Sequence, residues 1–178
     1  MSLQPIPEGP LKTGYTTGAC ATACAKAALL ALIKQTVIKD VEITLPFGEK
    51  VTFTVESCIV DKQQATCTTI KDAGDDPDVT HGAKIGCMVS FNDKKEIIFK
   101  RGKGVGVVTL PGLAIGVGEP AINPVPRKMM NAAIAFVLHQ FALDKGVNIE
   151  VFVENGEEIA RKTLNSRIGI LNGISILG

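Results

Sequence analysis

The feature that most constrains the fold is the segment ACATACAKAALLALIK at residues 19–34, which is apolar at almost every position. Thr22 and Lys26 are its only interior polar residues. A helix at the surface of a protein carries polar residues along one face, whereas a helix that is apolar all round is buried. We therefore predict a helix that is enclosed by other elements, capped by Thr16 or Thr17, and continued to about residue 34.

Short segments of alternating apolar and polar residues predict β-strands in much of the remaining chain. The first three could form a meander. Two later pairs of segments are expected to form hairpins, around Asn92-Asp93 and around Asn155-Gly156. The predicted strands are 41–45, 51–60, 65–70, 85–92, 95–100, 105–110, 147–155 and 158–164.

A second long helix is expected to begin at Asn123-Pro124 and to end near Leu143, because Asn is a favourable cap and Pro a favourable first helical residue. Two long helices and several strand hairpins predict an α+β fold, a two-layer sandwich whose sheet is mostly antiparallel or mixed. Residues 1–11 hold three prolines and predict an extended N-terminal arm, followed by a single α+β domain at residues 12–178. Because residues 167–178 are apolar, we expect this domain to continue past residue 178 as part of a longer protein.

The composition argues against several classes of protein. The formal net charge is +1 at pH 7, which disfavours bulk electrostatic binding of nucleic acid. No run of about 18 apolar residues and no signal-peptide pattern stand out, so we expect a cytoplasmic protein without a membrane span.

The five cysteines lack C-x-x-C spacing and are expected to be reduced, buried thiols. No metal site is expected, because Cys20 and Cys24 have no histidine near them in the sequence.

The first candidate site is the segment KTGYTTG, which precedes the apolar helix. A helix N-terminus carries unpaired N–H groups and partial positive charge. Glycines would let a ligand approach the backbone and threonines would add hydroxyl donors, so the segment could bind a carboxylate or a phosphate. The alternative is a plain capped helix start. The residues concerned are Thr13, Gly14, Thr16, Thr17 and Gly18.

The second candidate is the acidic loop KDAGDDPDVTHGA, residues 71–83. Its four carboxylates could bind a hard cation, act as a base or hold a cationic ligand. Mutual repulsion is expected to raise their pKa values, which would suit proton transfer. The alternative is a solvated loop, and the spacing is not that of an EF-hand. The carboxylates are Asp72, Asp75, Asp76 and Asp78.

The third candidate is the glycine-rich segment RGKGVGVV, which begins at Arg101. It lacks the terminal Gly-Lys-Ser/Thr of a P-loop, and no helix follows it as a dinucleotide fingerprint requires. It is therefore weak support for a nucleotide. Gly102, Gly104 and Gly106 could still admit a flat ligand, and Arg101 and Lys103 could pair with ligand carboxylates.

The fourth candidate is the lead-in to the second helix. Glu119 stands in an otherwise uncharged segment, and Arg127-Lys128 fall in the first turn of the helix. Basic residues there oppose the helix dipole, which favours a role with an anionic ligand, and the alternative is two exposed basic residues. Of the two histidines, His139 is expected to be a packed or capping residue, and His81, which closes the acidic loop, is the better functional candidate.

Taken together, four segments resemble the CbiD family, the cobalt-precorrin-5B C1-methyltransferases of anaerobic cobalamin biosynthesis. The segments are GYTTGACATACAKAA, KDAGDDPDVTHGA, GKGVGVVTLPGLAIGVGEPAINPVPRKM and RIGILNGISILG, and they occur from about residue 11 to the end of the chain. The resemblance implies that S-adenosylmethionine donates a methyl group to ring carbon C1 of a ring-contracted tetrapyrrole, giving cobalt-precorrin-6A. The cobalt would be carried by the substrate.

We distribute roles among the candidates by charge and placement, because the resemblance carries no residue-level mechanism. The substrate bears many carboxylates, the donor is a sulfonium cation, and in-line methyl transfer depends mainly on positioning. The expected substrate-binding residues are Thr13, Gly14, Thr16, Thr17, Gly18, Arg101, Lys103 and Arg127. The expected donor-binding residues are Gly102, Gly104, Gly106, Asp72 and Asp78, and the expected catalytic residues are Asp75, Asp76 and Glu119.

Two other functions are compatible with the sequence. One is a non-catalytic protein that binds a corrinoid intermediate, and the other is a small-molecule kinase of mixed α/β fold. The expected partner is the cobalt-containing tetrapyrrole, with no nucleic acid and no membrane. A homo-oligomer, or transient contact with other enzymes of the pathway, is also compatible with the sequence.

Overall fold

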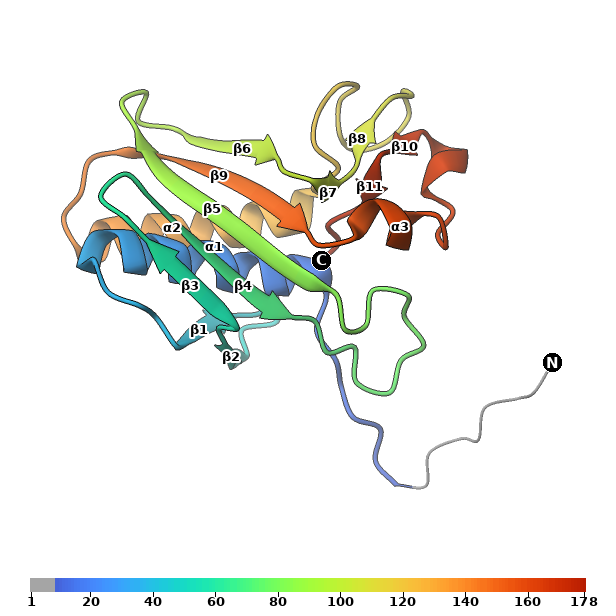
Figure 1. Cartoon of the computed structure of the whole chain (residues 1–178), viewed down its shortest axis with the longest axis horizontal. Helices are drawn as coiled ribbons and strands as arrows, with labels where there is room; N and C mark the ends of the chain where they lie inside the picture. The colour runs from blue at the N-terminus through green and yellow to red at the C-terminus, as the bar shows by residue number, and fades with distance from the viewer. Residues whose placement is uncertain (1–8) are drawn as a thin grey trace.

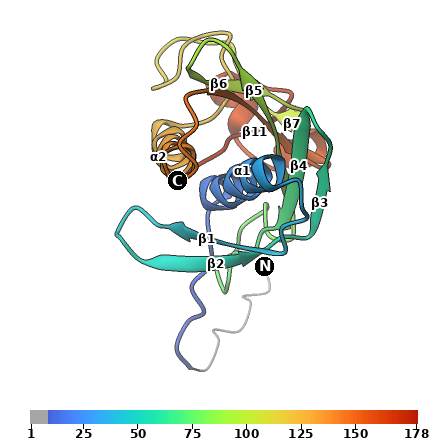
Figure 2. The same cartoon turned by 90° about the vertical axis from the view of Figure 1, so that its left-hand side faces the viewer.

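Helix α1 (Thr17–Lys34) lies at the centre of the computed structural model, which describes residues 9–178. A five-stranded sheet covers one side of α1, helix α2 (Pro124–Gln140) covers a second, and the hairpin of β1 and β2 covers a third (Figures 1 and 2). Among the described residues, α1 is the one helix long and apolar enough to cross a membrane, but 78% of it is buried inside the protein. Its all-round apolar sequence is explained by this enclosure, as predicted.

The sheet has the strand order β3-β4-β5-β9-β6. Neighbouring strands are antiparallel except β9 and β6, which are parallel. The small residues of α1 bring its backbone close to the sheet, since Cys24 Sγ donates to the Ile85 carbonyl and Cys87 Sγ donates to the Ala21 carbonyl, both at 3.3 Å. The strands are β3 (Ser57–Val60), β4 (Gln64–Ile70), β5 (Lys84–Asn92), β6 (Ile97–Arg101) and β9 (Gly146–Val153).

A separate antiparallel hairpin, β1 (Asp40–Thr44) and β2 (Lys50–Thr54), packs below α1 in the view of Figure 2 and touches the sheet where the Thr69 hydroxyl donates to the Thr54 carbonyl. In each strand, every second residue is buried. The buried members, Val41 and Ile43 on β1 and Val51 and Phe53 on β2, belong to the same hydrophobic core as α1 and the sheet. The hairpin therefore completes the enclosure of the central helix.

The end of the chain returns to the glycine-rich segment and to the start of α1. Strand β10 (Ile170–Leu171) pairs antiparallel with β8 (Val107–Val108), and β11 (Gly173–Ile174) pairs parallel with β7 (Gly104–Val105). In the sequence, a short helix, α3 (Gly156–Ala160), and a 3₁₀ turn, Asn165–Ile168, lie between β9 and β10. Figure 1 shows the C-terminus beside the first turn of α1.

The structure confirms the α+β class and the two long helices, with α2 ending at Gln140 rather than near Leu143. Both antiparallel pairings of the predicted meander are present, β1 with β2 and β3 with β4, but they belong to two sheets and not to one. The segment 51–60 is split between Val55 and Glu56. The Val55 N–H donates to the Lys39 carbonyl, next to β1, whereas the Glu56 N–H donates to the Thr68 carbonyl on β4. At this point the chain leaves β1 and joins the sheet. Most of the predicted N-terminal arm lies outside the described residues.

Both predicted hairpins are wrong for a shared reason, which is the position of β9. Residues 85–92 and 95–100 form β5 and β6, but β9 lies between them and pairs with both. Because both edges of β9 are occupied, no edge is left for a strand at 158–164. The chain instead turns at Asn155, in the left-handed conformation, into α3, whose first turn carries Glu157 and Glu158 in favourable positions for the helix dipole.

Candidate functional site

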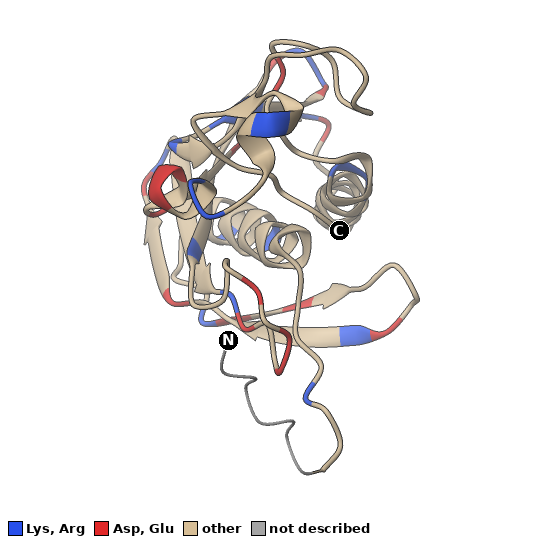
Figure 3. Cartoon of the chain, turned by 90° about the vertical axis from the view of Figure 1, so that its right-hand side faces the viewer, with Lys and Arg blue, Asp and Glu red and all other residues tan. Residues whose placement is uncertain are grey.

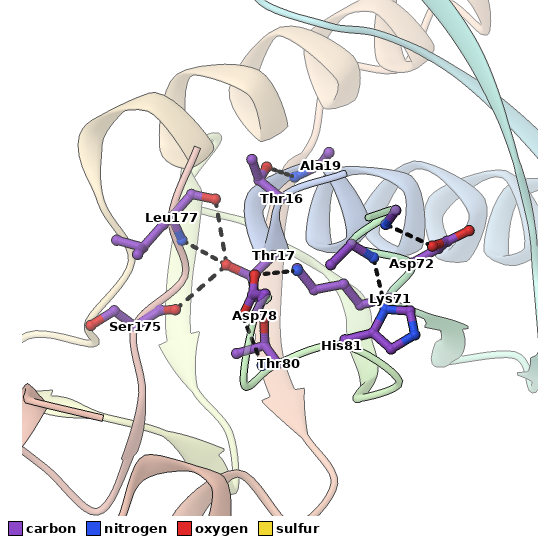
Figure 4. Close-up of polar contacts among 12 residues, drawn as sticks. Thr16, Thr17, Ala19, Lys71, Asp72, Asp78, Thr80, His81, Ser175 and Leu177 are labelled. Atoms are coloured by element: carbon purple, nitrogen blue, oxygen red, sulfur yellow. Dashed lines mark hydrogen bonds and ion pairs between the residues drawn. The ribbon is translucent and has the colours of Figure 1, made fainter. Parts of the chain in front are cut away.

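Three segments that are far apart in the sequence meet around one cavity, which we call the helix-entry pocket. Its volume is about 400 Å³. It is lined by residues 14–17 at the start of α1, by part of the acidic loop, and by residues near the C-terminus (Figure 4). The acidic-loop residues are Lys71, Ala73, Asp76, Asp78, Val79 and Thr80, and the C-terminal residues are Thr163, Asn165, Ile174, Ser175 and Leu177. Two of the predicted sites therefore meet in space.

The start of α1 is capped by its own threonine and by the C-terminal residues. Thr16 Oγ1 accepts a hydrogen bond from the Ala19 N–H at 3.0 Å, which confirms the predicted capping by Thr16. The Gly18 N–H donates to the Leu177 carbonyl at 2.7 Å. Two N–H groups that the sequence offered to an anion thus already have protein acceptors. A ligand in the pocket would meet side chains first.

Gly14 and Gly18 lie against the backbone of other segments of the protein, too close for a side chain. A Cβ on Gly14 would lie 1.9 Å from the carbonyl carbon of Ala73, and a Cβ on Gly18 would lie 2.6 Å from the Leu177 carbonyl oxygen. The N-terminal residues cross the acidic loop here, where Thr13 and Gly74 form a β-bridge. The close approach that these glycines allow is therefore used by the chain itself.

An ion pair between a buried lysine and a partly exposed aspartate links the acidic loop to the pocket. The Lys71 side chain is 2% exposed, and its Nζ lies 2.7 Å from Asp78 Oδ2. Asp78 Oδ1 accepts hydrogen bonds from the Thr80 N–H at 2.8 Å and from the Thr80 hydroxyl at 2.7 Å. Partial burial acts to raise the pKa of Asp78, but the hydrogen bonds from Lys71 and Thr80 outweigh it and lower the pKa to about 2.

The expectation that the loop carboxylates raise one another's pKa is wrong for Asp72 and Asp78, whose pKa values are both lowered. Hydrogen bonds from the Lys12 ammonium, at 2.6 Å, and from the Gly74 N–H lower the pKa of Asp72. Asp75 accepts a hydrogen bond from the Lys12 backbone N–H. Each of these carboxylates faces a cation or an N–H group. Asp76 differs, because no hydrogen bond to its carboxylate is found among residues 9–178; it is an exposed residue that belongs to the lining of the helix-entry pocket.

His81 supports the acidic loop from within. Its Nδ1 accepts a hydrogen bond from the Ala73 N–H at 3.0 Å, and the backbone N–H of His81 donates to the Asp78 carbonyl. Figure 3, which views this end of the molecule, shows acidic residues on the loop and on α3. His81 lines a shallow cavity of about 350 Å³ between the loop and α3, and does not line the helix-entry pocket. A role in holding the loop accounts for its position.

The glycine-rich segment packs against β9 and β10. A Cβ on Gly102 would lie 2.4 Å from the Val151 carbonyl oxygen, one on Gly104 2.0 Å from the Val153 carbonyl oxygen, and one on Gly106 2.5 Å from the Ile170 side chain. Arg101 Nε donates to the Val105 carbonyl at 2.8 Å. Lys103 and Gly104 line a second cavity of about 610 Å³ beside α3, together with several glutamates. These glycines allow close packing and do not form a phosphate cradle.

Glu119 and Arg127 come together, but they do not line the helix-entry pocket. The guanidinium of Arg127 donates to the carbonyls of Ile122 and Pro120, at 2.8 and 3.2 Å, and lies 3.5 Å from Glu119 Oε2. It also stacks over the Phe99 ring at 5.5 Å. Arg127 therefore holds the lead-in to α2 against the sheet.

The structure assembles only part of the predicted site. Of the predicted residues, Gly14, Thr16, Thr17, Asp76 and Asp78 line the helix-entry pocket. Thr13, Gly18, Asp72, Asp75, Arg101, Lys103, Gly102, Gly104, Gly106, Glu119 and Arg127 do not line it. Pocket residues that the sequence did not single out include the polar residues Lys71, Thr80, Thr163, Asn165 and Ser175. Lys71 and Thr80 belong to the acidic loop, and this was the one signal in the sequence for any of these residues.

The cysteines are free thiols, as predicted. Four are buried, and Cys58 is half-buried. Burial raises the pKa of Cys20 to about 12 and raises the pKa of Cys24 well above its usual value. Within residues 9–178, no group of three or more His, Cys, Asp or Glu side chains is arranged to hold a metal ion.

Comparison with known proteins identifies the family. The sequence profile of CbiD matches residues 5–178. The chain belongs to the CbiD family. A CbiD structure from Archaeoglobus fulgidus, titled a cobalamin biosynthesis protein, superimposes with a TM-score of 0.73 at 32% sequence identity, over 96% of this chain and 54% of that one. The three segments around the helix-entry pocket all fall within the matched residues.

Curated relatives in this family carry the name cobalt-precorrin-5B C(1)-methyltransferase. A relative from Geobacillus sp. (strain WCH70) is 54% identical over 94% of this chain and 46% of its own length. A relative from Priestia megaterium is 51% identical over 99% of this chain and 48% of its own length. The chain thus spans about half the length of the curated relatives it matches.

Proposed function

We propose that this chain forms part of a methyltransferase that uses S-adenosylmethionine to methylate ring carbon C1 of cobalt-precorrin-5B and yields cobalt-precorrin-6A. The observation that carries the proposal is the identity of about half of all aligned residues to curated relatives of that name, over nearly the whole chain. The cobalt belongs to the substrate. We further propose that residues 12–178 act as one α+β domain of this enzyme.

The helix-entry pocket supplies groups that suit the methyl donor or the substrate. Lys71 provides a cation and Asp76 a carboxylate on the same cavity, while Ala73, Val79 and Ile174 provide apolar wall. The amino-acid end of S-adenosylmethionine carries both an ammonium and a carboxylate, and the tetrapyrrole carries carboxylates on an apolar ring. When bound, the donor supplies the electrophilic methyl group. The residues of the chain would bind and align the reactants, which is the main requirement of an in-line displacement.

The geometry narrows the roles that we propose for individual residues. Asp76 is the carboxylate that we propose to contact a bound ligand, because it lines the pocket without a protein partner among residues 9–178. Thr16 and Thr17 are proposed to shape the same site. Asp72, Asp75, Glu119 and Arg127 are engaged within the protein, so we propose that they hold the loops in place.

Methyl transfer by the natural full-length polypeptide that carries this sequence tests the proposal. With S-adenosylmethionine and cobalt-precorrin-5B, the expected products are S-adenosylhomocysteine and a tetrapyrrole heavier by one methyl group. Asp76→Asn should lower kcat/KM about tenfold or more if the carboxylate meets a ligand cation. Asp93→Asn, in an exposed turn, is the matched control and should change nothing.

The alternatives predict different outcomes of the same experiment. Tight binding of the tetrapyrrole with no methyl transfer would support a non-catalytic corrinoid-binding protein. A kinase should bind ATP and magnesium. The packing of Gly102, Gly104 and Gly106 against protein atoms removes one of the two features that suggested a kinase, and the other is the threonine-rich start of α1.

A further inference from the structure

Lys71 is unusual for its burial. Among residues 9–178 it is the one lysine, arginine, aspartate or glutamate that is buried. The lysines of the other ion pairs are far more exposed: the side chain of Lys84 is 32% exposed, and that of Lys12, which pairs with Asp72, is 66% exposed. Removing a lysine ammonium from water is costly unless charged or polar partners compensate, so this residue needs a reason to be there.

The partners of Lys71 lie on the cavity side. An ammonium has three N–H donors, and within residues 9–178 the one hydrogen bond from Nζ goes to Asp78. The side chain of Asp78 is 37% exposed, so the carboxylate lies between the buried amine and solvent. Both residues line the helix-entry pocket with Thr17 and Ser175, and Figure 4 shows Lys71, Asp78 and Thr17 meeting at the start of α1.

The start of α1 adds positive charge to the same cavity. The N-terminal end of a helix carries about half a positive charge, and the first turn of α1 holds no acidic residue to offset it. Burial raises the pKa of Cys20, in that first turn, to about 12, and the nearby Lys71 ammonium opposes the rise. A buried cation and the positive end of a helix therefore face the same cavity, where Asp78 is the carboxylate that pairs with Lys71 and Asp76 is a second acidic residue in the lining.

Asp78 can release Lys71 without losing all of its own partners. Its Oδ1 accepts from the Thr80 N–H and the Thr80 hydroxyl, while Oδ2 alone bonds to Lys71. An incoming carboxylate could therefore take the place of Oδ2 while Asp78 keeps two hydrogen bonds. The lysine would keep a counterion throughout.

We infer that the helix-entry pocket is a carboxylate-binding site in which Lys71 is the recognition cation and Asp78 is a resident counterion that a ligand carboxylate replaces. Two sources of that carboxylate follow from the proposed function, on which this assignment rests. One is the amino-acid end of the methyl donor, and the other is a side-chain carboxylate of the tetrapyrrole. The anion site itself follows from the geometry of Lys71 and Asp78 alone.

Binding measurements on the full-length protein test the inference. The first probe is citrate, a tricarboxylate that is neither donor nor substrate, and the readout is the shift in Tm, since a ligand of the native state stabilises it. Citrate should raise the Tm of the wild type and of Lys12→Met, which removes an exposed lysine of a comparable ion pair. It should not raise the Tm of Lys71→Met. Asp78→Asn, which removes the competing counterion, should respond at lower citrate concentration than the wild type.

Calorimetric titrations then identify the source of the carboxylate. Lys71→Met should weaken binding about tenfold or more, the loss expected for one hydrogen bond to a charged group, for either S-adenosylhomocysteine or cobalt-precorrin-5B. The ligand affected is the source. If Lys71→Met does not fold, the double variant Lys71→Met/Asp78→Asn replaces it, because removing a buried pair together is tolerated better than removing one partner.

Two results would overturn the inference. One is a Lys71 variant, single or double, that responds to citrate and binds both ligands as the wild type does. The other is an Asp78→Asn variant that binds more weakly than the wild type, because Asp78 would then be a ligand contact. Binding of carboxylates that depends on Lys71, without any methyl transfer, would support the site and contradict the proposed function.

Discussion

A hydrogen bond joins Thr17, the first residue of α1, to Leu177, near the C-terminus. The Leu177 N–H donates to Thr17 Oγ1 at 2.8 Å, although 160 positions separate them in the sequence. The next residue of the helix, Gly18, donates its N–H to the Leu177 carbonyl at 2.7 Å. The first turn of α1 and the end of the chain are thus one structural unit, and the helix-entry pocket lies against it.

The first prediction concerns that contact. Thr17→Val keeps the shape of the buried side chain but leaves the Leu177 N–H without its acceptor. We expect the free energy of unfolding to fall by about 1–3 kcal/mol, the cost of an unsatisfied polar group. Urea denaturation measures it. Thr17→Ser should retain most of the stability, and Thr44→Val, at an exposed position of β1, should have little effect. Equal stability of Thr17→Val and the wild type would show that the contact contributes nothing.

The second prediction concerns the pH dependence of stability. The pKa of Asp78 is lowered from 3.8 to about 2 in the folded protein, so the unfolded chain binds more protons between these values. Stability from this group is therefore complete above pH 3.8 and is lost as the pH falls toward about 2. Asp78→Asn should flatten the dependence of the unfolding free energy on pH in this window. Asp93→Asn, the exposed control, should leave it unchanged, and an equally steep curve for Asp78→Asn would contradict the prediction.

The elements defined by local pattern were predictable from the sequence. The apolar run at 19–34 and the Asn123-Pro124 start predicted both long helices, because the signals for burial and capping lie in consecutive residues. Strand pairing was not predictable in the same way. The insertion of β9 between β5 and β6 depends on contacts some fifty residues apart, which no turn signal between residues 92 and 97 reveals.

The candidate site shows the same division. The helix entry and the acidic loop each stood out by composition, but their meeting with residues 174–177 is a property of the tertiary fold. The burial of Lys71 could not be predicted either, because a lysine beside four aspartates is ordinarily solvated. The glycines were recognised as sites of close approach, yet the sequence could not show that the approaching group is protein backbone.

The third prediction tests that interpretation of the glycines. Gly14→Ala would place a Cβ 1.9 Å from the backbone of Ala73, so the crossing of the N-terminal residues over the acidic loop must open. We expect a loss of stability of about 1–3 kcal/mol, the usual cost of overpacking. Gly116→Ala is the matched control, because its Cβ would meet only the Glu119 side chain, at 3.7 Å. Similar unfolding midpoints for the two variants would mean that residue 14 is not a tight crossing.

The fourth prediction separates the structural role of Arg127 from the role as a carboxylate clamp that the sequence favoured. Arg127→Ala leaves the carbonyls of Pro120 and Ile122 without their donor and removes the cation over the Phe99 ring. We expect the free energy of unfolding to fall by about 1–3 kcal/mol, measured by urea denaturation. Tetrapyrrole affinity, measured by calorimetry, should stay within about twofold, because the guanidinium donors already have protein acceptors.

Lys128→Ala is the matched control for this prediction, since Lys128 is exposed on the same turn of α2. It should change neither stability nor affinity. Arg127→Lys should restore little of the stability lost in Arg127→Ala, because a lysine cannot reach two carbonyls with the fixed fork of a guanidinium. An Arg127→Ala protein that unfolds like the wild type but binds the tetrapyrrole about tenfold more weakly would establish the clamp and refute the structural role.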